Sequence, residues 1–330
     1  ACGEIISSVV MVNALQKNGF KSKAMTGWQA GIVTDDNFGN SGVIKVTPNK
    51  ILSAIQNGYI PVVAGFQGIT EDGDITTLGR GGSDTTAAVL GEALSAHAIE
   101  IYTDVDGIMT ADPRIVPNAV ALEQISYSEV FQIADQGAKV IHPRAVEIAM
   151  RNNIPLIIKN TLTDSPGTVI SSYCKSDTIE QKTDPDQVVT GIAHIMNRTQ
   201  VIIEDISSHK QNELLLLLAK NHISIDLINI FPDKMVFTID GHETDKIKSI
   251  FDSFGYHYSF ICNCSKISAI GNRMRGVPGV MSRIIKAMTE KNIKVLQTAD
   301  SHTTISCLVM GEDTVKAVLA LHDEFNLYKR

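Results

Sequence analysis

The chain has 330 residues, of which 44% are hydrophobic, 20% charged and 5% aromatic, and its net charge is −7. It has no run of about 18 apolar residues, as a membrane-spanning helix needs, and its acidic balance and few aromatics disfavour nucleic acid and anionic membranes as main partners. Its five scattered cysteines predict no disulfide framework and indicate a reducing, cytoplasmic compartment. These features leave a cytoplasmic enzyme or a small-molecule-binding protein.

The first half of the chain alternates helical and strand patterns, which predicts an α/β fold with a mostly parallel sheet. Pro48 and Gly58 bracket one predicted helix in the usual order, with proline first and glycine last. Residues 59–66, YIPVVAGF, are almost continuously apolar, which predicts a strand covered on both faces. The other predicted helices are 3–18, 83–96, 127–135 and 143–152, and the other predicted strands are 21–26, 99–103 and 154–159.

The second half has the order βαββαβ of a ferredoxin-like unit. A polar linker precedes it, with a long surface loop inside one domain as the alternative. A second such unit follows but is one strand short, and we infer that residues 191–196, GIAHIM, supply that strand, so that the first unit is an insertion within the second. The predicted parts are a first domain at 1–170, a linker at 171–188, a unit at 198–263 and a unit made of 189–197 and 264–330.

In the second half, the predicted strands are 199–205, 223–230, 234–240 and 257–262 in the first unit, and 266–271, 293–299 and 303–310 in the second. The predicted helices are 209–221, 243–254, 278–292 and 313–325.

A glycine-rich stretch at 68–82 runs directly into the helix predicted from Ser83, and it holds five glycines in fifteen residues. Free backbone N–H groups and the helix dipole make such a place an anion site, and Arg80 adds a forked cation suited to carboxylate or phosphate. Ser83 or Asp84 is expected to cap the helix, and a purely structural glycine turn is the alternative. The stretch matches neither a Walker A loop nor a spaced G-x-G-x-x-G motif.

A second group of candidates follows the strand that ends at Thr103. Ligands bind beyond the carboxyl ends of strands in open α/β sheets, so Asp104 or Asp106 is a candidate for Mg²⁺ or a nucleotide hydroxyl, with an Asp-Gly turn as the alternative. Arg114 and Lys139 are candidate phosphate contacts, although a lone arginine is usually a solvated surface residue.

Two further positions have competing interpretations. Glu4 lies in the first turn of the first predicted helix, where it either offsets the helix dipole or binds a substrate ammonium group. His142 is interpreted as a hydrogen-bonded structural residue rather than a catalytic base.

The last unit contains a candidate site for a small ligand, in which a turn before a helix faces a polar strand end. A polar loop rim is the alternative. The candidate residues are Val277, Pro278, Gly279, Val280, Gln297 and Ser301.

Several long segments together resemble one enzyme family. GFQGITEDGDITTLGRGGSDTTAAVLGEAL, IYTDVDGIMTADPR and QGAKVIHPRAVEIA resemble the aspartokinases, with the greatest likeness to those of Gram-positive bacteria. IGNRMRGVPGVMSRIIKAM and VLQTADSHTTISCLV resemble the paired ACT domains of the same enzymes. The resemblance spans essentially the whole chain and implies an amino-acid-kinase fold, which is carbamate-kinase-like, followed by two ACT domains.

The resemblance also implies an activity and its partners. The reaction is the ATP-dependent, Mg²⁺-assisted phosphorylation of L-aspartate to 4-phospho-L-aspartate, which leads to lysine, threonine, methionine and diaminopimelate. Lysine, threonine or diaminopimelate is the implied effector, and a homodimer or higher homo-oligomer through the ACT domains is the implied assembly. The aspartate carboxylate is already a nucleophile at neutral pH, so direct in-line transfer requires only alignment and charge compensation.

The roles that the resemblance implies fall into two groups. Glu4 binds the substrate ammonium, and Arg80 binds its carboxylate in a pocket shaped by Gly81, Gly82, Ser83 and Asp84. The nucleotide contacts are Thr103, Asp104, Met109, Arg114, Lys139 and Val140, and Met109 stands where many members have a tyrosine near the adenosine. The residues expected to act in catalysis are Lys139, Arg80 and Asp84, and no protein side chain is assigned as a metal ligand.

One departure from the family pattern affects the expected activity. Family members begin with a strand and a Lys-Phe-Gly-Gly-Thr loop that supplies a phosphate lysine, whereas this chain opens at the helix with Glu4. We therefore expect little or no kinase activity from these residues alone, since phosphoryl transfer depends on positioned cations. The alternative function is a non-catalytic regulatory protein in which a degenerate kinase fold serves ACT-based amino-acid sensing.

Overall fold

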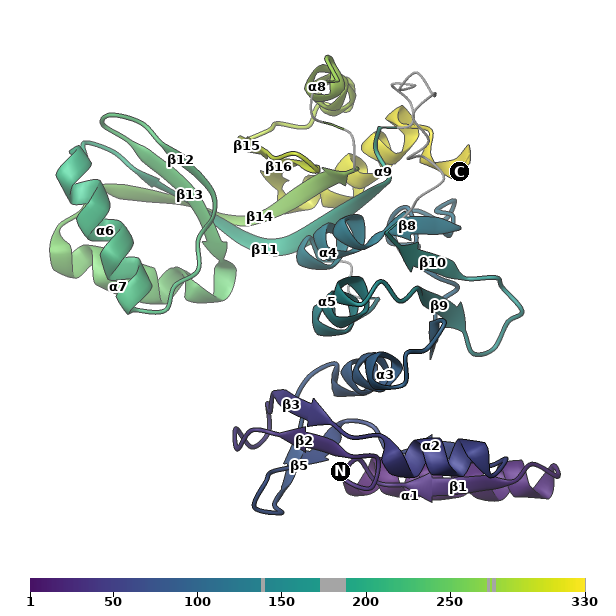
Figure 1. Ribbon diagram of the computed structural model, residues 1–330. Coiled ribbons are helices and arrows are strands. Elements are labelled where there is room, and N and C mark those ends of the chain that lie inside the picture. The colour runs from purple at the N-terminus through teal and green to yellow at the C-terminus, as the bar shows by residue number, and fades with distance from the viewer. Residues whose placement is uncertain (138–139, 173–187, 272–273, 275–276, 330) are drawn as a thin grey trace. The chain divides into compact units, whose positions relative to one another are not determined.

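The computed structural model describes residues 1–137, 140–172, 188–271, 274 and 277–329 (Figure 1). By their contacts these residues form two units. In its described parts, the first unit consists of residues 1–108, 121–134 and 140–172, and the second of 109–120, 135–137 and 188–329. This division differs from the predicted boundary near residue 170, because two short stretches of the first half pack with the second half.

The first unit has the α/β class that the sequence predicts, with helices at all the predicted places. Its helices are α1 (Cys2–Lys17), α2 (Asn49–Gln56), α3 (Gly82–Ala93), α4 (Tyr127–Asp135) and α5 (Pro143–Arg151). Its strands are β1 (Ser22–Met25), β2 (Ile32–Thr34), β3 (Val43–Val46), β4 (Ile60–Val63), β5 (Gln67–Ile69), β6 (Ile75–Thr77), β7 (Ile99–Thr103), β8 (Gln124–Ser126), β9 (Leu156–Asn160) and β10 (Thr168–Ser171).

The strands of the first unit pair in mixed rather than mostly parallel fashion. Their orders are β1-β4, β3-β2-β5-β6 and β7-β9-β10-β8. The β1/β4, β2/β5, β7/β9 and β8/β10 pairs are parallel, and the others are antiparallel. The parallel β7 and β9 bring their carboxyl ends to the same edge, which is where Thr103 and Asp104 lie.

The expectation for β4 is only partly correct. A strand forms, but it is not covered on both faces, because Ile60 is 43% exposed and the following three residues are half-buried. The reason is that β4 pairs with β1 in a sheet of two strands. Its apolar sequence reflects packing against α1 and α2.

The second unit contains one six-stranded antiparallel sheet, in the order β12-β13-β11-β14-β16-β15. Its strands are β11 (Gly191–Ile203), β12 (Asp226–Ile230), β13 (Met235–Asp240), β14 (Tyr258–Ile270), β15 (Gln297–Asp300) and β16 (Thr304–Met310). Its helices are α6 (Ser208–Lys220), α7 (Thr244–Phe254), α8 (Val280–Glu290) and α9 (Thr314–Glu324).

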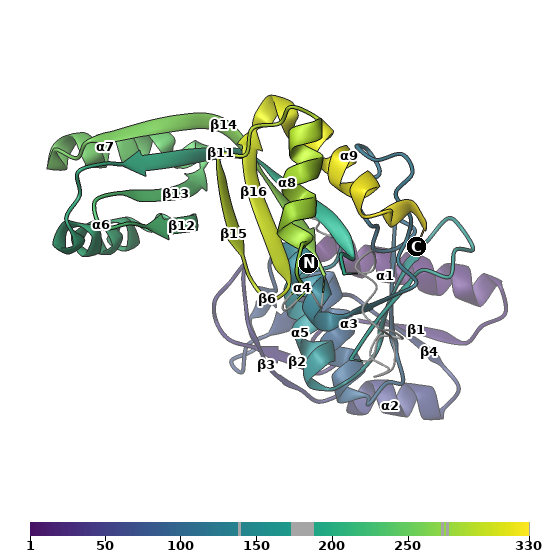
Figure 2. The same ribbon diagram turned by 90° about the horizontal axis from the view of Figure 1, so that it is seen from above.

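Two long strands, β11 and β14, run through both halves of this sheet (Figure 2). The sequence predicts two short strands in each of these places, and the structure instead joins them. Residues 191–195 of β11 pair with residues 266–270 of β14, whereas residues 198–203 pair with β13 and with the start of β14. The first of these pairings is the one that an interleaved pair of ACT units requires.

The two halves of the sheet have the same local contact at the point where they join. Asn197 in β11 and Asn263 in β14 both have left-handed backbones, with φ of 56° and 53°. Each lies against the glycine that begins a short 3₁₀ turn, Gly241 and Gly311 respectively, and a Cβ on either glycine would overlap the asparagine. Matched contacts at matched places indicate that the two halves are repeats of one ferredoxin-like unit.

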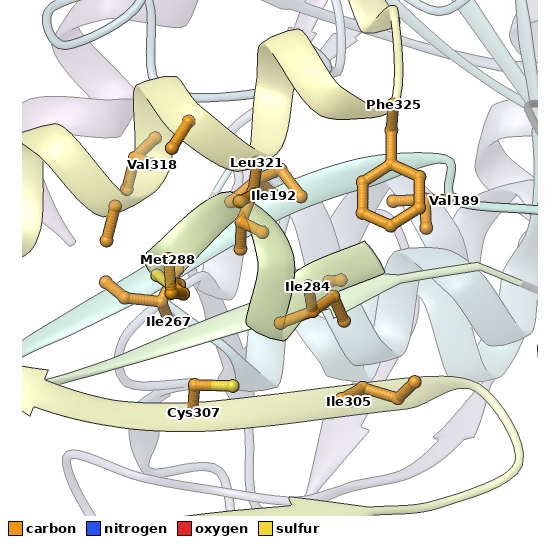
Figure 3. Close-up of a cluster of buried hydrophobic side chains, with 14 of the residues drawn as sticks. Val189, Ile192, Ile267, Ile284, Met288, Ile305, Cys307, Val318, Leu321 and Phe325 are labelled. Carbon is orange, nitrogen blue, oxygen red and sulfur yellow. The ribbon is translucent and has the colours of Figure 1, made fainter. Parts of the chain in front are cut away.

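Each half has its own core. The larger cluster lies between α8, α9 and the β11, β14 and β16 strands, and it includes Ile267, Ile284, Leu321 and Phe325 (Figure 3). The smaller cluster lies beneath α6 and α7 and is centred on Phe237 and Phe251, which are both fully buried.

Candidate functional site

The glycine-rich stretch becomes the start of α3, and its geometry requires glycine. Gly81 is the N-cap of α3 with a left-handed backbone, φ 69°, and a Cβ at this position would overlap the imidazole of His142. The preceding Arg80 is exposed, and among the described residues its guanidinium has no hydrogen-bond or ion-pair partner. The helix start therefore presents backbone N–H groups beside an uncommitted cation.

A second helix start lies against the first. The backbone N–H of His142 donates to the Asp84 carboxylate at 3.2 Å, which ties α5 to the first turn of α3. The His142 Nδ1 accepts a hydrogen bond from the Arg144 N–H at 3.3 Å and so caps α5, while Arg144 itself donates to the Leu78 carbonyl at 3.4 Å. The structural interpretation of His142 is therefore confirmed. Two positive helix ends meet here, which is a suitable environment for anions.

The end of β4 brings the start of α1 to the same region. The Phe66 N–H donates to Thr86 Oγ1 in α3 at 3.0 Å, and the next residue, Gln67, donates through Nε2 to the carbonyl of Ala1 at 3.1 Å. Gln67 is fully buried, and its Oε1 has no hydrogen-bond partner among the described residues. The segment 66–67 thus contacts both helix starts.

Glu4 lies in the first turn of α1, and its carboxylate is partly exposed. A hydrogen bond from its own backbone N–H lowers the pKa of the Glu4 carboxyl. The carboxylate is therefore ionised at neutral pH, as an ammonium-binding group needs to be.

Two of the predicted nucleotide residues, Thr103 and Asp104, lie where β7 ends and a loop begins, and this loop is fixed to the loop after β9. The Thr103 hydroxyl donates to the Asp104 carboxylate at 3.1 Å, and the Thr103 carbonyl accepts from the N–H of Thr161 at 2.8 Å. Asp106 Oδ1 accepts from Asn160 at 2.8 Å and from Thr163 at 3.0 Å. Asp106 is therefore committed to the loop, whereas the exposed Asp104 carboxylate faces solvent.

The loop ends in a turn that only glycine fits. Gly107 has φ 148°, and a Cβ there would overlap the Thr168 hydroxyl, which accepts a hydrogen bond from the N–H of Ile108 at 2.8 Å. The loop after β7 and the start of β10 are thereby held together.

The structure does not place all the predicted nucleotide residues in this unit. Met109 and Arg114 belong by their contacts to the second unit. The Arg114 guanidinium pairs with Asp112 at 2.7 Å, and this hydrogen-bonded pair holds the pKa of the Asp112 carboxyl below its usual range. Val140 is half-buried, and Lys139 lies outside the described residues.

The candidate effector residues are divided between the two faces of the sheet. Gly279 caps α8 with φ 95°, and Val280 enters the large core beneath that helix. Gln297 is on the opposite face, where its Nε2 donates to Asn229 at 2.7 Å and to the Leu227 carbonyl in β12. Its Oε1 accepts from Gln200 at 3.0 Å. The structure therefore does not bring Gln297 together with the turn at 277–280.

Ser301 is also occupied, because it builds the turn between β15 and β16. Its hydroxyl lies 2.8 Å from Thr304 Oγ1 and accepts from the Thr304 N–H at 3.1 Å.

The sequence analysis missed a buried ion pair on the same face as Gln297. Lys266 in β14 is 4% exposed and pairs with Asp226 at the start of β12. Ionisable residues inside otherwise apolar strands, as in ISIDLINI and CSKISAI, were the available signal. Charged residues are almost never fully buried without a partner, so each of these strands implied a partner elsewhere.

Among the described residues, no group of three or more histidine, cysteine, aspartate or glutamate side chains could hold a metal ion. Mg²⁺ in kinases is bound through one or two carboxylates and the substrate phosphates, and the exposed Asp104 carboxylate fits that pattern. No described helix is long and apolar enough to cross a membrane.

Comparisons with known proteins agree with this architecture. Residues 1–160 match the amino acid kinase family, and residues 259–323 match an ACT domain. Aspartokinase 1 of Bacillus subtilis is 46% identical over 335 residues, covering 100% of this chain and 81% of the relative. The aspartokinase of Mycolicibacterium smegmatis is 36% identical, covering 98% of this chain and 80% of the relative.

The chain belongs to the aspartokinase family. It is a phosphotransferase with the activity of an aspartate kinase. Among solved structures, the aspartate kinase of Clostridium acetobutylicum has a TM-score of 0.80 at 26% identity, with 98% of this chain and 74% of that chain covered. E. coli aspartokinase III in complex with aspartate and ADP has a TM-score of 0.75 at 28% identity, with the same coverage. The predicted resemblance, the amino-acid-kinase fold and the assignment as an aspartate kinase are thus confirmed, while the low activity expected of these residues alone stays a prediction.

Proposed function

We propose that this aspartokinase holds L-aspartate at the start of α3 and transfers the γ-phosphate of ATP directly to its side-chain carboxylate. The observation that carries the proposal is the meeting of two helix N-termini at Gly81 and His142, beside the exposed guanidinium of Arg80. A fixed array of N–H groups stabilises the charge that develops on a transferring phosphoryl group without reorganisation.

Two charged groups define the proposed aspartate site. Arg80 binds a carboxylate of the substrate in bidentate fashion, and the ionised Glu4 binds its ammonium. Gly81 and Gly82 let His142 and Phe66 pack closely against the start of α3, and the exposed Ser83 lies beside them. Asp84 positions the second helix start by accepting the His142 N–H.

The proposed nucleotide site is the loop after β7. Thr103 and Asp104 are its proposed contacts, and the nucleotide roles that the resemblance implies for Met109, Arg114, Lys139 and Val140 stay predictions. Mg²⁺, when bound with ATP, offsets phosphate charge, and Asp104 is the described carboxylate that would hold it. No proton has to be removed from the nucleophile, since an aspartate side chain is already ionised at neutral pH.

The test compares Arg80→Ala with Arg151→Ala, a matched control at the far end of α5 whose side chain is 64% exposed. Calorimetry measures aspartate and ADP affinity, and trapping of the acyl phosphate with hydroxylamine measures turnover. Arg80→Ala should weaken aspartate binding about tenfold or more, as expected for lost charged hydrogen bonds, and should leave ADP affinity unchanged. Equal aspartate affinity in the two variants would remove Arg80 from the site.

We further propose that an amino acid regulates the enzyme through its ACT halves, and that the enzyme works in the cytoplasm. E. coli aspartokinase III has been solved in complex with lysine and aspartate, at a TM-score of 0.77 to this chain. Lysine, threonine and diaminopimelate are the candidates here. Thermal unfolding with each one separately identifies the effector, since a ligand of the native state raises the midpoint.

We also propose that the enzyme self-associates through the ACT halves. The sheet edge at β12 carries exposed apolar side chains, with Ile230 53% and Phe231 48% exposed. An unpaired strand edge with apolar side chains favours pairing with another chain. Sedimentation of the protein and of an Ile230→Lys variant tests this, and a monomeric parent protein would exclude it.

A further inference from the structure

Residues of the two matched families contact each other inside the second unit. Thr110 lies within the amino acid kinase match, and His322 lies within the ACT match. By contacts, however, the whole segment Met109–Val120 belongs to the second unit. We call this segment the docking segment.

The docking segment is part of the core of the second unit. Ala111 is 4% exposed and Val116 is fully buried, and both belong to the large cluster beneath α8 and α9. The Thr110 carbonyl accepts a hydrogen bond from the N–H of Ile192 in β11 at 2.8 Å. The segment is therefore fixed to the sheet by both backbone and side chains.

A side-chain contact connects the docking segment to α9. Thr110 and His322 are both fully buried, and Thr110 Oγ1 lies 3.0 Å from His322 Nε2. His322 Nδ1 has no hydrogen-bond partner among the described residues. The threonine hydroxyl is thus the one hydrogen-bonding contact of this imidazole within the described chain, and it also accepts from the N–H of Val120 at 3.2 Å.

The same segment continues directly from the loop after β7. The N–H of Thr110 donates to the Val120 carbonyl at 2.9 Å, and two residues earlier the Ile108 carbonyl accepts from the Leu122 N–H at 2.8 Å. These two hydrogen bonds form a short two-stranded ladder that includes Thr110 and Ile108. The N–H of Ile108 in turn donates to the hydroxyl of Thr168, the first residue of β10. Met109 lies between Thr110 and Ile108 in the ladder.

We propose that Thr110 and His322 are positioning residues through which α9 of the ACT unit fixes the carboxyl end of the nucleotide loop. This inference rests on the proposed function in one respect, the assignment of residues 103–109 to the nucleotide. Because His322 of α9 holds the Thr110 hydroxyl, it also fixes the position of the neighbouring backbone at Met109. A shift of α9 then changes the affinity for ATP with no direct effect on the aspartate site.

The first test compares Thr110→Val with Thr314→Val. Thr314 is a matched control, because it is a buried threonine of α9 whose hydroxyl donates to Ser265 at 2.6 Å, away from the docking segment. Hydrogen exchange of the amides at 103–108 should speed up about fivefold in Thr110→Val and stay unchanged in Thr314→Val, the size expected for one buried hydrogen bond. Equal exchange in both variants would overturn the proposal.

The second test separates positioning from general loss of structure. In Thr110→Val, calorimetry should show the Kd for ADP rising about fivefold while the Kd for aspartate stays constant, and Thr110→Ser, which keeps the hydroxyl, should restore the ADP affinity. A parallel rise of the two Kd values, or no rescue by serine, would show a merely structural role and overturn the proposal.

The third test uses the unmodified protein and so does not depend on the variants folding. Because coupling is reciprocal, ADP should slow the exchange of α9 amides near His322 as well as those of the loop. Protection of the loop without α9 would contradict the coupling. If ADP does not bind, the proposed nucleotide site fails, and the exchange comparison without ligand still decides whether Thr110 fixes the loop.

Discussion

The contact between Gly81 and His142 makes a strong prediction about stability. In Gly81→Ala, the new methyl group occupies the place of the His142 ring while the backbone keeps φ 69°. A left-handed backbone costs a non-glycine residue about 1 kcal/mol. Moving His142 also breaks its hydrogen bond to Asp84, about 1 kcal/mol, and the cap of α5, about 1 kcal/mol.

The expected total is therefore a loss of about 3 kcal/mol in the free energy of unfolding. Gly58→Ala is the matched control, because Gly58 has φ 75° and a Cβ at this position would have no other atom within 4 Å. It should lose only the backbone contribution, about 1 kcal/mol.

Urea titration followed by the fluorescence of Trp28 measures both variants, since Trp28 is the single tryptophan of the chain and lies in the first unit. A difference between Gly81→Ala and Gly58→Ala of less than about 0.5 kcal/mol, within the usual scatter of surface substitutions, would refute the argument that His142 closes this site. If the two variants differ strongly in stability but Gly81→Ala binds aspartate as the parent protein does, the contact between Gly81 and His142 is not part of the aspartate site.

Three other predictions concern the second unit. Burial lowers the pKa of His322, so below about pH 6.5 the unfolded chain binds a proton that the folded chain does not bind. The free energy of unfolding should therefore be constant above that pH and fall below it. Urea midpoints measured against pH should fall less steeply in His322→Gln. Lys266→Met should lower the free energy of unfolding by about 2 kcal/mol, because it leaves Asp226, which is 35% exposed, without its ion-pair partner. The double variant with Asp226→Leu should recover most of this loss in the same urea titration. Arg114→Ala should change the free energy of unfolding by less than about 0.5 kcal/mol, since the Arg114 side chain is 88% exposed. Any loss of ATP affinity measured by calorimetry then reports a phosphate contact.

Local signals predicted the helices well and the short strands poorly. The bounds predicted for α4, 127–135, agree with the structure, because its amphipathic pattern and first-turn acid are local properties. By contrast, β2, β5 and β6 have three residues each. A strand of that length shows no periodicity, and its pairing depends on partners elsewhere in the chain.

The site shows the same limit. The glycine turn at the start of α3 was visible in the sequence, because left-handed glycines and a following helix leave a local pattern. The contact of Gly81 with His142 was not, because it joins residues far apart in the chain. Gln297 illustrates the converse. Its position at a polar strand end suggested a ligand contact, but the alternation of the strand turns its side chain toward β12. There Asn229 and Gln200 already form hydrogen bonds with its amide group.

The shared strands β11 and β14 restrict how the protein can be divided or recombined. Because each strand contributes one end to either half of the sheet, a chimera that exchanges a single ACT repeat must cut both strands in the middle. The unit to be transplanted is the complete block from residue 188 onward. The recipient must also supply a docking segment with small apolar side chains at the places of Ala111 and Val116, or the transplanted core is left open.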